Sequence, residues 1–309
     1  MRQGKLTNEQ LSEIVLSELK PARDDVVLRP GVGVDCGAVI FGDQLCVVST
    51  DPITVKTAGA GALAVQVSIN DVAASGAEPV AALLTILAPP DVDISEIAAI
   101  VQDAQLMARK ENIEIIGGHT EVTDAVNRIV LSVTALGKIA SDKLIRAENA
   151  KEGDDIVMTK YAAIEGTRIM MGDDAPFSED MLSVSKEARI ASAFGASAMH
   201  DATEGGVLGA AWEIAQAGGL GVHIYADEIP VHPATARACA ERGMDPLRLI
   251  ASGSMIIAHP KGEALCAELE KHGVKATVIG RLVSGESRIT LAGKTLPLAP
   301  PEADEIYKL

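Results

Sequence analysis

The chain has 309 residues, of which 48% are apolar and 23% charged, and 43 acidic residues against 27 Lys and Arg give a formal charge of −16. This composition describes a packed globular protein long enough for two domains. The acidic charge, with only three Phe, three Tyr and one Trp, argues against nucleic-acid binding, which requires basic stripes and stacking rings. The four scattered cysteines, a start without an apolar signal core and the absence of a long apolar run predict a soluble, cytoplasmic protein with reduced thiols.

The first half of the chain predicts alternating helices and strands. In chain order, the expected elements are an amphipathic helix over residues 6–20, strands at Ala38–Phe41 and Leu45–Ser49, a helix over 60–75, a buried strand in "VAALLTILAP", a helix in "DISEIAAIVQDAQLMARKENI", a strand in "IEIIGGHT" that ends in a glycine turn, and a strand in "RIVLSVTALGKI".

The second half begins where the polar and then β-rich stretch "NAKEGDDIVMTK" marks a boundary near residue 150, so we expect domains over 1–150 and 151–309. It continues with a helix in "EGTRIMM", a polar segment over 172–185, further helices, a strand in "GVHIYA", a helix bounded by Pro, a pair of strands in "SGSMIIAHP" and "KATVIGRLV", and a last strand before a Pro-rich tail. Mixed elements in both halves predict a two-domain α+β protein.

The stretch "GAGALA", residues 59–64, matches the glycine pattern of a dinucleotide-binding Rossmann fold. That fingerprint also requires an acidic residue about 20 positions later, at the end of the next strand. Glu78 has the spacing, but it precedes its strand. A Rossmann-type oxidoreductase is therefore a minor alternative, and a standard P-loop is excluded because no G-x-x-x-x-G-K-[ST] motif is present.

Four aspartates are candidate metal ligands: Asp35, Asp51, Asp71 and Asp201. Each has a simpler reading. Asp35 could be a solvated loop residue, Asp51 before a proline could open a turn, and Asp201 could cap a helix together with Glu204. Asp71 is the hardest to explain in this way, because it lies within an apolar helix where a carboxylate is costly without a partner or a metal. Carboxylates gathered from several elements suit oxygen-ligated Mg²⁺, through which an acidic protein can hold phosphates.

The stretch "IIGGHT" is a second candidate phosphate-binding segment. Two glycines let backbone N–H groups approach an anion, and His119 and Thr120 follow them. An ordinary turn at the end of a strand is the alternative.

Together these segments resemble the superfamily of aminoimidazole ribonucleotide (AIR) synthetase, selenophosphate synthetase, thiamine-monophosphate kinase and the hydrogenase-maturation dehydratase. The segments that carry the resemblance are "GKL", "VDCGAVI", "STDP", "NDVAASGAEP", "IIGGHTEV", "TKYAAIEGT", "HDATEGGVLGAAWEIA" and "ASGSMIIA". The resemblance implies an N-terminal α+β domain that binds ATP and dimerises through its sheet, and a C-terminal α+β domain of the AIR synthase type. It also implies ATP bound with Mg²⁺.

Carried over position by position, the resemblance assigns the four aspartates to metal binding. It places Thr50 and Asn70 beside them and matches Gly117, Gly118 and Thr120 to a phosphate-contacting turn. Lys5, in "GKL", and His119 are the candidate catalytic residues.

Some features depart from individual relatives. The hydrogenase-maturation dehydratase ends in a cysteine, whereas this chain ends in "EIYKL", and the first cysteine here is Cys36, unlike the reactive N-terminal residue of selenophosphate synthetase. We therefore expect ATP- and Mg²⁺-dependent phosphoryl transfer to an amide, carboxyl-type or phosphate oxygen of a small molecule. The alternative is an ATP-binding maturation or scaffold protein that requires a partner.

Overall fold

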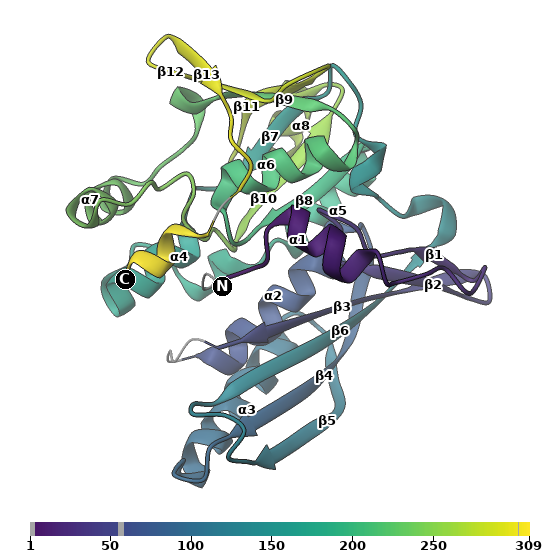
Figure 1. Cartoon of the computed structure of the whole chain (residues 1–309), viewed down its shortest axis with the longest axis vertical. Helices are drawn as coiled ribbons and strands as arrows, with labels where there is room; N and C mark the ends of the chain where they lie inside the picture. Colours follow the sequence, from purple (N-terminus) through teal and green to yellow (C-terminus); the bar gives the residue numbers. More distant parts are fainter. Residues whose placement is uncertain (1–3, 55–58, 302) are drawn as a thin grey trace. The chain divides into compact units, whose positions relative to one another are not determined.

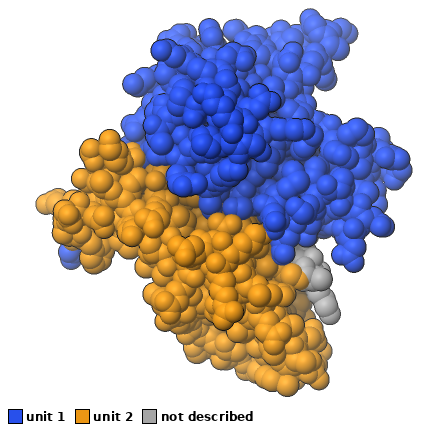
Figure 2. Space-filling model, turned by 180° about the vertical axis from the view of Figure 1, so that it is seen from behind, with its two compact units in different colours: residues 1–23, 30–34, 145–309 blue, residues 24–29, 35–144 orange. Residues whose placement is uncertain are grey.

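The computed structural model describes residues 4–54, 59–301 and 303–309. It divides into two compact units, which Figure 2 colours separately: unit 1 holds residues 1–23, 30–34 and 145–309, and unit 2 holds residues 24–29 and 35–144. Each unit contains one sheet together with helices, which confirms the α+β prediction (Figure 1). Within the described ranges, no helix has both the length and the apolar character needed to cross a membrane.

Unit 2 is built on a six-stranded sheet of order β1-β2-β3-β6-β4-β5. Its strands are β1 (Val26–Leu28), β2 (Gly37–Phe41), β3 (Gln44–Ile53), β4 (Glu78–Ala88), β5 (Glu114–Val122) and β6 (Val130–Ala140). Neighbours are antiparallel except for β4 and β5. A Rossmann fold requires a mostly parallel, doubly wound sheet, so this topology contradicts the oxidoreductase alternative.

The helix expected over residues 60–75 is present as α2 (Ala60–Ala74), and every residue of it is buried. Such complete burial follows from its Ala, Val, Leu and Ile content on all sides. The glycines of "GAGALA" have structural roles here. Gly59 caps the helix in the left-handed conformation (φ 76°), and a Cβ on Gly61 would lie 2.0 Å from the carbonyl oxygen of Ile100 on α3 (Ile94–Lys110). Close packing of the two helices therefore requires glycine at position 61.

The N-terminal helix differs from the expectation. Residues 8–16 form α1 (Asn8–Gln10) followed by a π-helical stretch, Leu11–Leu16, and none of these residues is buried. Ile14 is 63% exposed. A π-helix has more residues per turn than an α-helix, so apolar residues three and four apart no longer form one buried face.

The glycine turn predicted after "IEII" is wrong. Strand β5 continues through both glycines to Val122, paired in parallel with β4, and Gly118 lies opposite Leu84. A Cβ on Gly118 would lie 1.8 Å from the carbonyl oxygen of Leu84. These glycines therefore allow two strands to approach each other.

Unit 1 is built on a seven-stranded sheet of order β13-β12-β9-β11-β7-β10-β8. Its strands are β7 (Asp155–Thr159), β8 (Ala198–Ala202), β9 (Gly221–Tyr225), β10 (Ser254–His259), β11 (Ala276–Val283), β12 (Arg288–Leu291) and β13 (Lys294–Pro297). Its helices are α4 (Ile164–Met171), α5 (Ser185–Phe194), α6 (Gly206–Ala217), α7 (Pro233–Arg242) and α8 (Gly262–Lys271). The two strands predicted as a pair, β10 and β11, lie on either side of β7 and do not pair with each other. Helix α8, between them in the chain, was not predicted.

The core of unit 1 lies between the sheet and α6, whose buried residues include Val207, Leu208 and Ile214. They pack against Ile156 and Ile256 from the strands. Small side chains fill the remaining space, which is how so few aromatic residues suffice for the core.

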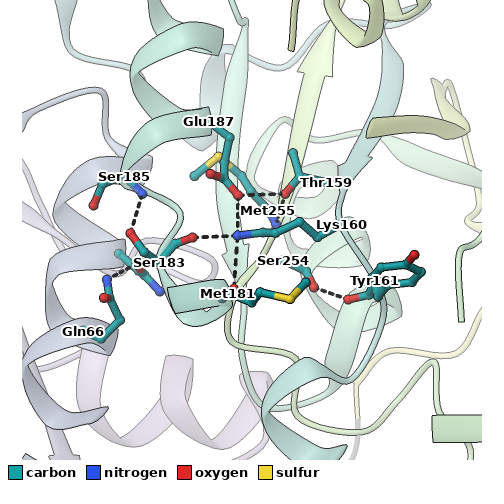
Figure 3. A network of polar contacts seen from close by, with 11 residues as sticks. Gln66, Thr159, Lys160, Tyr161, Met181, Ser183, Ser185, Glu187, Ser254 and Met255 are labelled. Atoms are coloured by element: carbon teal, nitrogen blue, oxygen red, sulfur yellow. Dashed lines mark hydrogen bonds and ion pairs between the residues drawn. The ribbon is translucent and has the colours of Figure 1, made fainter. Parts of the chain in front are cut away.

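A buried ion pair fastens α5 to the end of β7. Nζ of Lys160 lies 2.6 Å from Oε1 of Glu187, and it donates to the carbonyl oxygens of Met181 and Ser183 (Figure 3). Thr159 also donates to Glu187. Lys160 therefore ties the strand, the helix and the segment before the helix together.

Candidate functional site

Asp71 and Asn70 lie in the buried interior of α2, and Asp71 is only 5% exposed. The hydroxyl of Ser49, on β3, lies 2.6 Å from Oδ2 of Asp71 and 2.9 Å from the backbone carbonyl oxygen of Asp35. One hydroxyl proton can serve only one of these acceptors at a time. Ser49 thus links two of the predicted metal ligands within unit 2.

The side chain of Asn70 is oriented by its own helix. Nε2 of Gln66, one turn earlier on α2, donates to Oδ1 of Asn70 at 2.9 Å, and both residues are fully buried. With Oδ1 engaged by Gln66, the Nδ2 donors of Asn70 point away from Gln66.

Asp51 and Thr50 lie on opposite faces of the same strand, because side chains alternate along β3. Asp51 shares the face of the buried residues Val47 and Ser49, whereas Thr50 is exposed. The hydroxyl of Thr50 accepts a hydrogen bond from Thr134 of β6 at 3.0 Å. The turn reading of Asp51 is wrong, since β3 continues to Ile53.

The residues of "GGHT" lie on β5, at the edge of the sheet, and all four are exposed. The side chain of His119 is 65% exposed, and its Nε2 lies 3.2 Å from Oε2 of Glu121. Gly117 and Gly118 precede it in the strand, and Thr120 follows it.

Asp201 belongs to unit 1, where it is completely buried in β8. The helix-capping reading is wrong, because the N-cap residue of α6 is Gly205. The neighbouring His200 has a carboxylate near each ring nitrogen: Nδ1 lies 4.0 Å from Oδ1 of Asp201, and Nε2 lies 3.0 Å from Oε2 of Glu213. Glu213 positions the His200 ring from the second turn of α6.

Lys5 also belongs to unit 1 and is exposed. Its charge acts on Tyr307, whose hydroxyl donates to Oε1 of Glu204 at 3.0 Å. Burial and the charge of Glu204 raise the pKa of Tyr307 to about 12, and the charge of Lys5 opposes this shift. Nearby, Glu165 at the start of α4 is buried, and burial raises its pKa to about 7.

Sequence reasoning missed two residues that orient the candidate site in unit 2. Ser49 could have been found from strand alternation, because it lies two residues before Asp51 and so shares its face. Gln66 could have been found from its spacing, because it lies four residues before Asn70 on a predicted helix.

Oxygen donors dominate this set of residues. Asp35, Asp51 and Asp71 in unit 2, and Asp201 in unit 1, offer only carboxylate oxygens, which is the ligand type that Mg²⁺ prefers. The residues present therefore fit the metal that the sequence resemblance implies.

Two family descriptions match this chain. "AIR synthase related protein, N-terminal domain" matches residues 33–139, and "AIR synthase related protein, C-terminal domain" matches residues 151–292. These matches cover most of the sequence, so the chain belongs to the AIR synthase-related family.

Among individual relatives, a protein named for hydrogenase expression and formation in Methanocaldococcus jannaschii is 28% identical over 297 residues, covering 90% of this chain and 88% of the relative. The carbamoyl dehydratase HypE of Bradyrhizobium diazoefficiens is 28% identical over 267 residues, covering 82% and 77%. The crystal structure of Escherichia coli HypE, a hydrogenase maturation protein, matches with a TM-score of 0.77 and 26% identity, covering 84% and 88%.

Two solved structures at 23% identity, both with a TM-score of 0.76, share the fold. One is HypE in complex with ATP, covering 98% of this chain and 97% of that chain. The other is a HypE–HypF complex, covering 85% and 93%.

Proposed function

We propose that this protein is an ATP- and Mg²⁺-dependent enzyme that transfers a phosphoryl group to an oxygen of a small molecule. An amide, a carboxyl-type group or a phosphate supplies that oxygen. The relative named carbamoyl dehydratase favours an amide of the carbamoyl type. Phosphorylation turns the amide oxygen into a phosphate leaving group; breaking the C–O bond then releases inorganic phosphate while the nitrogen loses its protons, which dehydrates the amide overall.

The observation that carries this proposal is the pair Asn70–Asp71 in a completely buried helix. An ionised carboxylate in such a place is costly unless it is compensated. The Ser49 hydroxyl compensates part of this cost, and a divalent cation would compensate more. A helix that exists only to pack would have no need of Asp at this position.

In the proposal, Asp35, Asp51, Asp71 and Asp201 hold Mg²⁺, which neutralises phosphate charge when bound. Ser49 holds the Asp71 carboxylate in one orientation, and Gln66 directs the Nδ2 donors of Asn70 away from itself, toward a phosphate oxygen. Thr50, Gly117, Gly118 and Thr120 are assigned to the nucleotide, and Lys5 and His119 to the reacting groups. Positioning and charge neutralisation by such residues account for most of the catalysis of phosphoryl transfer.

We also propose that two copies pair through the sheet of unit 2. On the face of the sheet that carries Thr50, Phe41 of β2 and Leu83 of β4 are exposed apolar side chains. Light scattering tests the pairing. The wild type should be a dimer and the Leu83→Glu variant a monomer; a monomeric wild type would contradict the proposal.

The variant Asp71→Asn tests the metal role, because it keeps the shape of the side chain and removes the charge. We expect it to lose Mg²⁺-dependent release of ADP while its unfolding midpoint stays close to that of the wild type. The matched control is Asp103→Asn on α3, outside the site, which should keep full activity. Undiminished ADP release by a folded Asp71→Asn protein would overturn the assignment.

A second candidate function is an ATP-binding maturation protein that turns over only with a partner. The observation that favours it is the solved complex of HypE, which shares this fold, with HypF. The two functions separate in one comparison: binding of an ATP analogue and release of ADP by the purified protein, alone and with a panel of small amides and phosphates. Tight binding with no release in any mixture would favour the partner-dependent function.

A further inference from the structure

The C-terminal segment of the chain is attached to unit 1 through one buried carboxylate. Asp304 is 3% exposed and accepts three backbone hydrogen bonds. Its Oδ2 accepts from the N–H of Gly205 at 2.7 Å, and its Oδ1 accepts from the N–H groups of Ile250 at 3.1 Å and Ile306 at 2.8 Å. Asp304 therefore joins three chain segments at one point.

Apolar packing anchors this segment at two points: Leu298 belongs to the buried core around α6, and Ile306 packs against a buried cluster that includes Met244 and Leu249. Ala299, Pro300 and Ala303 are exposed, and a cavity of about 280 Å³ lies between the segment and Gly205. Two further polar contacts flank Asp304: Tyr307 donates to Glu204, and the N–H of Asp245 donates to Glu305. Between Leu298 and Ile306, the attachment thus depends on directed hydrogen bonds.

The segment is attached to the loop that follows Asp201. Residues 203–206 form the turn from β8 into α6, whose first residue is Gly206, and both Gly205 (φ 87°) and Gly206 (φ 63°) adopt the left-handed conformation. Two consecutive glycines are flexible, so the loop conformation needs contacts that hold it. The hydrogen bond from Gly205 to Asp304, at 2.7 Å, is shorter than the backbone hydrogen bonds of Thr203 and Gly206.

We propose that Asp304 is a positioning residue that holds the 203–206 loop, and through it Asp201 and the start of α6, in the form that binds the metal nucleotide. This inference rests on the proposed function for the role of Asp201. The attachment of the loop itself stands on the geometry alone.

The variant Asp304→Asn distinguishes the hydrogen bonds accepted by the two carboxylate oxygens of Asp304. Asn keeps one carbonyl oxygen, which can still accept from Ile250 and Ile306, but it presents N–H donors to the N–H of Gly205. Hydrogen exchange measured by mass spectrometry should therefore become about tenfold faster in peptides covering 203–206, as expected for about 1.4 kcal/mol, and stay unchanged at 250. Asp304→Ala should accelerate exchange at both places, and Asp173→Asn, at an exposed position, should change neither. Unchanged exchange over 203–206 in both Asp304 variants would overturn the attachment.

The proposed effect of Asp304 on metal binding by Asp201 is tested by the Mg²⁺ dependence of ADP release. If Asp304 positions the loop, Asp304→Asn should raise the half-saturating Mg²⁺ concentration about fivefold at saturating ATP, with an unfolding midpoint near that of the wild type. A purely structural role would lower the midpoint and leave the Mg²⁺ dependence unchanged, and that result would overturn the proposal. If wild-type protein releases no ADP, the proposed function fails, whereas the exchange data still decide the attachment.

Discussion

Lys160 and Glu187 form a buried ion pair, with Nζ and Oε1 2.6 Å apart and with side chains 14% and 3% exposed. Removing one partner leaves the other charge buried and uncompensated, which typically costs about 3–5 kcal/mol. We expect Lys160→Met to lower the free energy of unfolding in urea by about that amount. The double variant Lys160→Met/Glu187→Leu should recover much of the loss. The matched control is Lys143→Met, because Lys143 forms an exposed pair with Asp142.

Gly61 allows α2 to approach α3. In Gly61→Ala, the added methyl group would meet the carbonyl oxygen of Ile100 at 2.0 Å, so the helices must separate. We expect a loss of about 3 kcal/mol in the free energy of unfolding, within the upper range for overpacking. Gly209→Ala on α6 is the control, because its Cβ would meet nothing closer than 3.5 Å. A loss no larger in Gly61→Ala than in the control would show that the helices have room to adjust.

Ser49→Ala removes the hydroxyl beside Asp71. A hydrogen bond from a hydroxyl to a charged carboxylate contributes about 1.5–3 kcal/mol, so the variant should lose a similar amount of stability in the absence of metal. We also expect weaker binding of Mg²⁺ with an ATP analogue, measured by calorimetry. Ser132→Ala, on an exposed contact with Thr50, is the control. Equal binding by both variants would contradict the orienting role of Ser49.

Glu165 predicts a pH dependence of stability. Burial, together with the charges of Asp304 and Glu204, raises its pKa from 4.5 to about 7, while the Ser252 hydroxyl and Arg168 act in the opposite direction. The folded protein therefore binds a proton that the unfolded chain has released, so the free energy of unfolding falls as pH rises from about 4.5 to 7. The Glu165→Gln variant should lack this contribution, about 2 kcal/mol, when urea unfolding is compared at pH 5 and pH 7.5. Identical pH profiles for both proteins would show that Glu165 titrates normally.

Much of the local structure was predictable because it depends on residues close together in the sequence. The helix over residues 60–75 and the strands at 38–41 and 45–49 are present within a few positions. The N-cap of α3 is Asp93, which accepts from the N–H of Ser95, as expected from the Asp and Ser at its start. The turn predicted at "GGHT" was wrong for a physical reason. Glycine permits a turn and also a close approach of strands, and only the neighbouring strand β4 distinguishes the two.

The candidate site also has features that the sequence predicted and features that only the structure decided. The sequence alone determined that Asp71 lies in an apolar helix and needs compensation, because the surrounding residues leave that helix no polar face. Only the tertiary structure decided that Ser49 meets Asp71 and that Asp304 holds Gly205 from 99 positions away. Local propensities act over a few residues, whereas these contacts arise when distant segments are brought together by burial of the apolar core, and no short pattern records which of them will meet.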